Sequence, residues 1–107
     1  MALKTGDIID ERKNHEQSCG IVAKILSGGA GFEKLVCCGN KLGEGDVVSS
    51  YSDSGRMEGE IIKKGAIIDE KKNHTDSCGF RVKVLGGGAG FKEIVCCGNV
   101  LTEQDVI

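Results

Sequence analysis

Short apolar runs separated by glycine-rich stretches dominate the sequence. The run at 80–85 alternates, with three apolar residues on one face and Arg81 and Lys83 on the other, which is typical of a half-buried β-strand. A β-branched run at 21–26 occupies the matching place earlier in the chain. No segment shows a convincing helical period. The pattern therefore predicts a small all-β fold.

Each of these runs is followed by glycines and then by a second short apolar run, at 33–36 or 92–95. Glycine supplies the positive φ angles that a tight turn needs, so each pair of runs is expected to form a β-hairpin. The isoleucine pairs at 8–9 and 67–68 are candidates for a third short strand. A phosphate-binding loop is disfavoured, because a β-like run and not a helix follows the glycines.

The sequence repeats itself with a period of 59 residues. Residues 3–47 align with residues 62–106 without a gap, and 28 of the 45 aligned positions are identical. We expect two copies, at 1–48 and 60–107, joined by a serine- and glycine-rich linker at 49–59 that spans roughly 18 Å. Two possibilities for this linker stay open: it connects two separate modules, or it is a wide surface loop within one fused domain.

Size and charge restrict the fold and its partners. The chain has 107 residues, of which 39% are apolar and 4% aromatic, so each copy is too small to fold on its core alone and needs a staple. The net charge is -2, with no basic stripe, which argues against nucleic acid. No apolar run is long enough to span a membrane, and no signal peptide is visible. We therefore expect a cytoplasmic protein whose six cysteines stay reduced.

The cysteines and histidines follow one pattern, His-x3-Cys-x17-Cys-Cys, in both copies. The pattern consists of His15, Cys19, Cys37 and Cys38, and then of His74, Cys78, Cys96 and Cys97. Three thiolates and one imidazole are the number and type of ligands that a tetrahedral Zn or Fe site needs. A glycine follows Cys19 and Cys38 and their counterparts, which lets the backbone fold tightly and point N–H groups at the sulfur. We expect two metal ions per chain, iron or zinc.

Disulfide bonding and simple burial account less well for the cysteines. An odd number of cysteines per copy leaves one thiol over in any disulfide scheme within a copy, and six repeat-matched cysteines beside glycines are unusual for plain core residues. The fourth ligand is less constrained than the cysteines. Its alternatives to histidine are Glu16, which becomes Thr75 in the second copy, a water molecule, or a side chain of a partner.

At this point the motifs resemble a known family. The run at 82–85, the glycines after it, and Val-Cys-Cys-Gly-Asn at 95–99 with Leu101 resemble desulforedoxin and the N-terminal domain of desulfoferrodoxin, which have rubredoxin-like or zinc-ribbon folds. The resemblance covers about 30 residues of each copy. It implies that Cys19, Cys37 and Cys38, and likewise Cys78, Cys96 and Cys97, are metal ligands. The family's first cysteine has no counterpart, and Glu16 and Thr75 hold its place.

The resemblance also implies an arrangement and a function. Desulforedoxin is a homodimer, so two fused copies would pair within the chain around a pseudo-two-fold axis. The first hypothesis is a redox protein with one iron per copy, which passes electrons to a partner protein. The alternative is a zinc-ribbon pair, in which structural zinc supports a protein-interaction surface. A catalytic metal with an open position is disfavoured, because no general base near the motif is common to both copies: Glu16 becomes Thr75.

Overall fold

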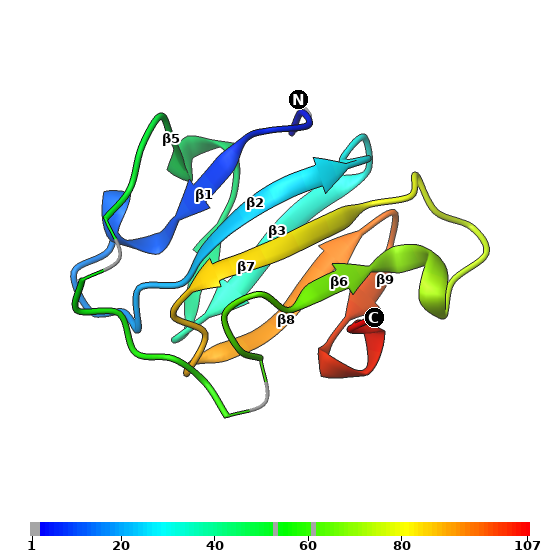
Figure 1. Ribbon diagram of the computed structural model, residues 1–107. Coiled ribbons are helices and arrows are strands. Elements are labelled where there is room, and N and C mark those ends of the chain that lie inside the picture. Colours follow the sequence, from blue (N-terminus) through cyan, green and yellow to red (C-terminus); the bar gives the residue numbers. More distant parts are fainter. Residues whose placement is uncertain (1–2, 53, 61) are drawn as a thin grey trace.

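The computed structural model describes residues 3–52, 54–60 and 62–107, and these form an all-β structure (Figure 1). The strands are β1 (Ile8–Asp10), β2 (Val22–Ser27), β3 (Phe32–Cys37), β4 (Asn40–Leu42), β5 (Val47–Val48), β6 (Ile67–Asp69), β7 (Arg81–Gly86), β8 (Phe91–Cys96) and β9 (Asn99–Leu101). The helical elements in the described ranges are 3-10 turns of three residues each, η1 (Glu11–Lys13), η2 (Glu44–Asp46), η3 (Glu70–Lys72) and η4 (Glu103–Asp105). This confirms the predicted all-β class.

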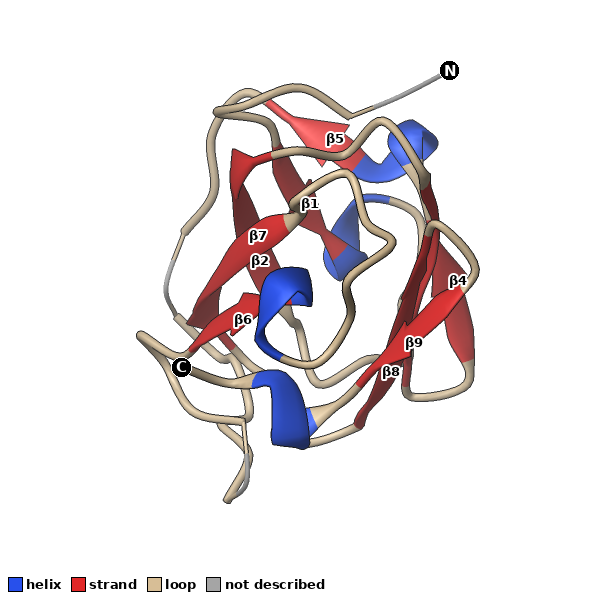
Figure 2. Ribbon diagram, turned by 90° about the vertical axis from the view of Figure 1, so that its right-hand side faces the viewer, coloured by secondary structure: helices blue, strands red, loops and turns tan. Residues whose placement is uncertain are grey.

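The strands form two antiparallel sheets that face each other (Figure 2). One sheet has five strands in the order β5-β1-β2-β7-β6, and the other has four in the order β4-β3-β8-β9. At the centre of each sheet a strand of the first copy pairs with its counterpart in the second, β2 with β7 and β3 with β8. Each sheet is therefore built from strands of both copies, and the strands of the two copies occupy matching positions in it.

The prediction that the runs at 21–26 and 33–36 pair as a hairpin is wrong, and so is the matching prediction for the second copy. β2 and β3 leave the glycine-rich turn into different sheets, and each pairs across the repeat. A two-stranded hairpin is marginally stable in water, whereas pairing across the repeat gives each sheet four or five strands and encloses a core. The glycines that suggested a hairpin turn serve close packing instead: a Cβ on Gly28 would lie 2.6 Å from the backbone of Phe80.

The core lies between the two sheets. Leu35 and Ile94 face each other across the β3–β8 pair and are 2% and 1% exposed. In β7, Val82 and Val84 are buried while Arg81 and Lys83 are exposed, as the alternating pattern predicted. Phe80, just before β7, is buried and packs against Phe32 with ring centroids 5.6 Å apart.

The true tight hairpin of each copy joins β3 to β4, or β8 to β9. Cys37 pairs with Asn40, so the turn consists of Cys38 and Gly39 alone. Their φ angles are 55° and 77°, as a two-residue turn of type I′ requires. Positive φ is uncommon for a residue with a side chain and marks a special position. Cys97 and Gly98 repeat this geometry at 54° and 75°.

The segment between the copies runs along the surface of the two-sheet unit. Glu58 forms an isolated β-bridge with Gly88, and Arg56 is buried against the first copy. The predicted division into 1–48, 49–59 and 60–107 describes the repeat in the sequence. It remains a prediction for the domains, since strands of both copies occur in each sheet. None of the helical turns in the described ranges has the length or apolarity needed to cross a membrane.

Candidate metal centres

Four potential metal ligands come together in each copy. In the first copy, Glu11, Cys19, Cys37 and Cys38 each place one ligand atom within 4.8 Å of all the others, and we call this group site 1. The corresponding group, site 2, consists of Glu70, Cys78, Cys96 and Cys97. These are the two clusters of this kind in the part of the chain that the structure describes. They suggest two metal ions per chain.

Four separate parts of each copy supply the ligands. Glu11 is the first residue of η1, directly after β1, and Cys19 lies in the loop before β2. Cys37 ends β3, and Cys38 is the first residue of the tight turn to β4. The left-handed conformation of Cys38 brings two successive side chains to the same centre, with their sulfur atoms 4.0 Å apart.

The spacing of the donor atoms fits a four-coordinate metal. The sulfur atoms of Cys19 and Cys37 are 3.3 Å apart, and Oε1 of Glu11 is 3.8 Å from the Cys19 sulfur. The equivalent distances in site 2 are 3.5 and 3.7 Å. A tetrahedron with metal–sulfur bonds of about 2.3 Å has edges of about 3.8 Å. The donors are therefore compatible with a thiolate-bound zinc or iron ion.

Each site is covered by the glycine-rich turn of the other copy. The Cys38 N–H donates to the carbonyl of Gly90 at 2.8 Å, and the Cys97 N–H donates to the carbonyl of Gly31 at 2.8 Å. A Cβ on Gly90 would lie 2.3 Å from the Cys38 sulfur, and one on Gly31 would lie 2.3 Å from the Cys97 sulfur. Only glycine fits here, and each site is built from both copies.

Backbone N–H groups face the sulfur atoms. The Cys19 N–H donates to the Cys38 sulfur at 3.2 Å, and the Cys78 N–H donates to the Cys97 sulfur at 3.2 Å. The Gly29 N–H, from the opposite copy, donates to the Cys78 sulfur at 3.4 Å. Such donors stabilise thiolate charge and orient the ligands.

The thiols of one site differ in their ionisation. The hydrogen bond from Cys37 lowers the pKa of Cys19 to about 4, so Cys19 is a thiolate at neutral pH. The same hydrogen bond, with burial, raises the pKa of Cys37 far above its usual range. In site 2, burial opposes ionisation of Cys78, but backbone N–H groups of Gly31 and Gly29 outweigh it and lower the pKa, while burial raises the pKa of Cys96. Each site thus holds one thiol with a lowered pKa beside thiols whose pKa is raised.

The buried carboxylates are the residues that the sequence interpretation missed. Glu11 and Glu70 are both 0% exposed. The Asn40 side-chain amide donates to Oε2 of Glu11 at 2.9 Å, and burial raises the pKa of that carboxyl. Asn99 holds Glu70 in the same way at 2.9 Å. The signal was an Asp-Glu pair repeated directly after each Ile-Ile strand.

The two histidines lie beside other acids. Nε2 of His15 is 3.8 Å from Oδ1 of Asp46, and Nε2 of His74 is 3.6 Å from Oδ1 of Asp105. Among the described residues, neither histidine belongs to a group of three or more potential ligands whose atoms lie within 4.8 Å of one another, and Glu16 is exposed outside site 1. Ligation by the histidines stays a prediction, and the structure brings a glutamate to the place expected for them.

A comparison of the chain with family models, with curated proteins and with solved structures finds no match. The structure by itself shows two tandem cysteine-rich β units with possible metal clusters, which fit a rubredoxin-like module.

Proposed function

We propose that each site binds one iron ion and that the chain is a small redox protein with two mononuclear centres. The observation that supports this proposal is the meeting of three sulfur atoms and one carboxylate oxygen within 4.8 Å, twice in one chain. Thiolates suit iron and zinc and do not suit calcium or magnesium. Iron held in this way takes up and gives up one electron between Fe(II) and Fe(III).

The resemblance of the motifs to desulforedoxin supports iron over zinc. In that family the metal is iron, and the vicinal cysteines after a glycine-rich stretch are its most specific element. Here Cys37-Cys38 and Cys96-Cys97 hold these positions. The pairing of β2 with β7 and of β3 with β8 is compatible with a desulforedoxin-like homodimer fused into one chain.

We propose Glu11 and Glu70 as the fourth ligands, with His15 and His74 as the alternative. The glutamates are fully buried beside the sulfurs, where an uncompensated carboxylate would be unfavourable, and a metal ion supplies the missing positive charge. The choice of ligand sets the direction of the redox potential. A carboxylate keeps the ligand charge of a four-thiolate site and favours Fe(III), whereas a neutral imidazole removes one negative charge and favours Fe(II).

The exposed ligands mark where electrons would pass to a partner protein. Cys38 and Cys97 are exposed, while Cys37 and Cys96 are 0% exposed. Because these exposed residues lie on tight turns, a docked partner could approach each metal through a single ligand. The remaining ligands are held by sheet and core, which limits their movement when the charge of the metal changes.

A pair of structural zinc ions is the second candidate, favoured by the closed set of four protein ligands in each site. Structural zinc sites are four-coordinate and filled by protein, and they contribute folding energy. In that case the metals would stabilise the two-sheet unit and present its surface to a partner protein.

The metal is identified in protein purified anaerobically from its own host. Two irons per chain, with a visible thiolate-to-Fe(III) absorption that bleaches with dithionite, would support the redox proposal. A colourless protein with two zinc ions would refute it in favour of the structural pair. Zinc in protein from a foreign host would not count against iron, so the native source is essential.

The fourth ligand is tested by two matched double variants in the iron-loaded chain. Glu11→Gln with Glu70→Gln keeps the shape of the side chains and removes their charge, so it should change the visible spectrum and raise the potential. His15→Ala with His74→Ala should leave both unchanged. The opposite result would assign the histidines as ligands.

A further inference from the structure

The segment between the copies runs along the Cys19 side of site 1, and no segment in the described residues takes the same place beside the Cys78 loop of site 2. We call residues 54–57 the strap. The Met57 N–H donates to the carbonyl of Cys19 at 2.8 Å, and the Met57 carbonyl accepts from the Ala89 N–H at 3.1 Å. The strap therefore ties the ligand loop of the first copy to the covering turn of the second, directly beside site 1.

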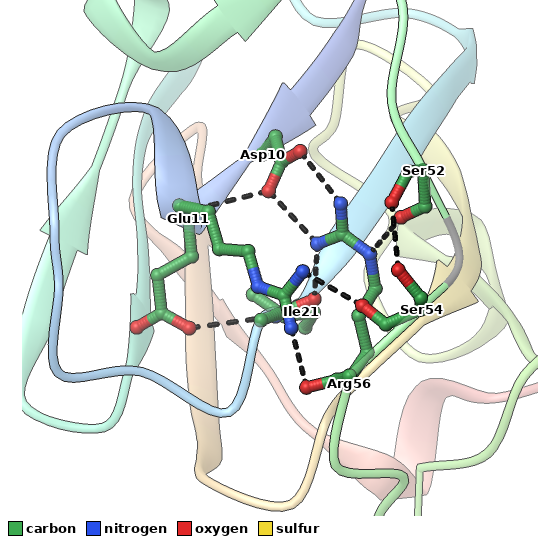
Figure 3. A network of polar contacts seen from close by, with 9 residues as sticks. Asp10, Glu11, Ile21, Ser52, Ser54 and Arg56 are labelled. Carbon is green, nitrogen blue, oxygen red and sulfur yellow. Dashed lines mark hydrogen bonds and ion pairs between the residues drawn. The ribbon is translucent and has the colours of Figure 1, made fainter.

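Arg56 anchors the strap in a buried network (Figure 3). Its side chain is 4% exposed and forms a two-pronged ion pair with Asp10, at 2.9 Å for each nitrogen. It also donates to the carbonyl of Gly20 at 2.7 Å, next to the ligand Cys19, and to the carbonyl of Ser52 at 2.6 Å. A bidentate arginine–carboxylate pair with low exposure is a strong and specific contact.

Arg12 fastens the strap from the outside. It donates to the carbonyl of Ser54 at 2.8 Å and to the carbonyl of Gly55. Arg12 is on η1, directly after the proposed ligand Glu11. Both arginines thus connect the strap to segments that carry ligands of site 1.

In the second copy, the equivalent aspartate forms its ion pair with an arginine of the same copy. Asp69, the counterpart of Asp10, pairs with Arg81 on its own β7 strand at 3.1 Å, and the Arg81 side chain is 46% exposed. The first copy has Val22 at the position of Arg81, so Asp10 takes its arginine from the strap instead. The second copy has Lys71 at the position of Arg12.

The loop that carries Cys19 is less exposed to solvent than the loop that carries Cys78. Cys19 is 4% exposed, whereas Cys78 and the following glycine are partly exposed. In the described residues, Met57 has no equivalent on the Cys78 loop. Water or a chelating group can therefore reach the Cys78 side of site 2 without any segment moving.

We infer that the two metal sites are functionally unequal: site 2 exchanges its metal with small ligands in solution faster than site 1, where the strap covers the Cys19 side of the site. This inference rests on the proposed metal binding at both sites. Ligand displacement by a chelator needs access to the metal, and local opening of a segment held by a buried ion pair is rare.

The test uses the full chain loaded with two cadmium ions and then mixed with excess EDTA. The loss of thiolate-to-cadmium absorption should show two phases of equal amplitude. In the Cys97→Ser variant, which weakens site 2, the slow phase should remain. In the Cys38→Ser variant, which weakens site 1, the fast phase should remain.

Two strap variants and one control identify the cause. Arg56→Ala should accelerate the slow phase by about tenfold or more, because it removes one partner of a buried pair. Arg12→Lys should accelerate it less and keep the fold, because the second copy already carries lysine at that position. Arg81→Ala breaks the ion pair with Asp69, where no strap lies, and should leave the slow phase unchanged.

The outcomes separate the inference from the proposed function. A chain that fails to bind two cadmium ions would overturn the proposed function and, with it, the inference. Two bound ions that leave in a single phase, a slow phase that belongs to site 2, or a slow phase insensitive to Arg12→Lys and Arg56→Ala would overturn the inference alone.

Discussion

Replacing Gly90 by alanine is expected to damage site 1, although Gly90 belongs to the second copy. The added Cβ would lie 2.3 Å from the Cys38 sulfur and 3.0 and 3.2 Å from the backbone N and Cα of Cys38. Ordinary contacts between such atoms are about 3.5–4.0 Å, so the overlap exceeds about 1 Å at the sulfur and is smaller at the two backbone atoms. Backbone atoms cannot rotate away, and the turn that carries Cys38 has to shift.

The size of the effect follows from this overlap. Forcing an extra carbon into a packed site costs about 1–3 kcal/mol. If this cost falls on the metal-bound state, the affinity of site 1 drops by about one to two powers of ten. Site 2, whose own cover is Gly31, should keep its affinity.

The assay is a cobalt titration of the full chain, read from the visible bands of tetrahedral Co(II). Gly90→Ala is measured in a Cys97→Ser background, which reports site 1, and in a Cys38→Ser background, which reports site 2. Gly31→Ala should give the mirror result. Gly45→Ala is the control, because nothing lies within 4 Å of the added carbon. A loss confined to the site of the same copy would refute the cross-copy construction of the sites.

Three further predictions concern stability and pH. Removing both metals with a chelator should lower the thermal midpoint by roughly 15–30 °C per site, if free metal is about a thousandfold above Kd before chelation; calorimetry with an unchanged midpoint would contradict the stapling role. Metal binding has to displace the Cys37 proton, since the hydrogen bond that Cys37 donates to Cys19, together with burial, raises the pKa of Cys37. Zinc affinity, measured by chelator competition, should therefore fall as the pH falls, by about tenfold per pH unit for each proton displaced, and a flat profile would oppose this. Leu35→Ala should cost about 2–5 kcal/mol in denaturant unfolding of the zinc-loaded chain, because Leu35 is 2% exposed against Ile94. Val100→Ala is its control, since Val100 is 50% exposed.

The sequence predicted the strands and the cysteines well, because both leave local signals. The alternation at 80–85 reappears as β7, and the repeated Cys-Cys-Gly motif reappears as the turn that carries two potential ligands. Strand pairing is not a local property. Glycines between two apolar runs are equally compatible with a hairpin turn and with a turn that packs closely against another segment, as Gly28 does against Phe80.

The sequence interpretation overlooked Glu11 as a candidate fourth donor for a similar reason. Histidine is a common zinc ligand, and His15 lies close to Cys19 in the sequence, whereas a glutamate at the start of a helical turn normally faces solvent. Burial of Glu11 depends on Asn40 and on the Ile21 N–H, which come from distant segments. Only the assembled sheets bring these groups together.

The glycine-rich turn of each copy packs over the candidate metal site of the other copy, and this affects the order of events during synthesis. When the first copy has left the ribosome, Cys19, Cys37 and Cys38 are all present, but the turn at Gly90 that closes over them has not yet been made. The β2 and β3 strands likewise lack their β7 and β8 partners. The nascent first copy therefore has to wait, with its thiols unprotected, until β7, β8 and the turn at Gly90 have been translated, and neither candidate metal centre can be completed before then.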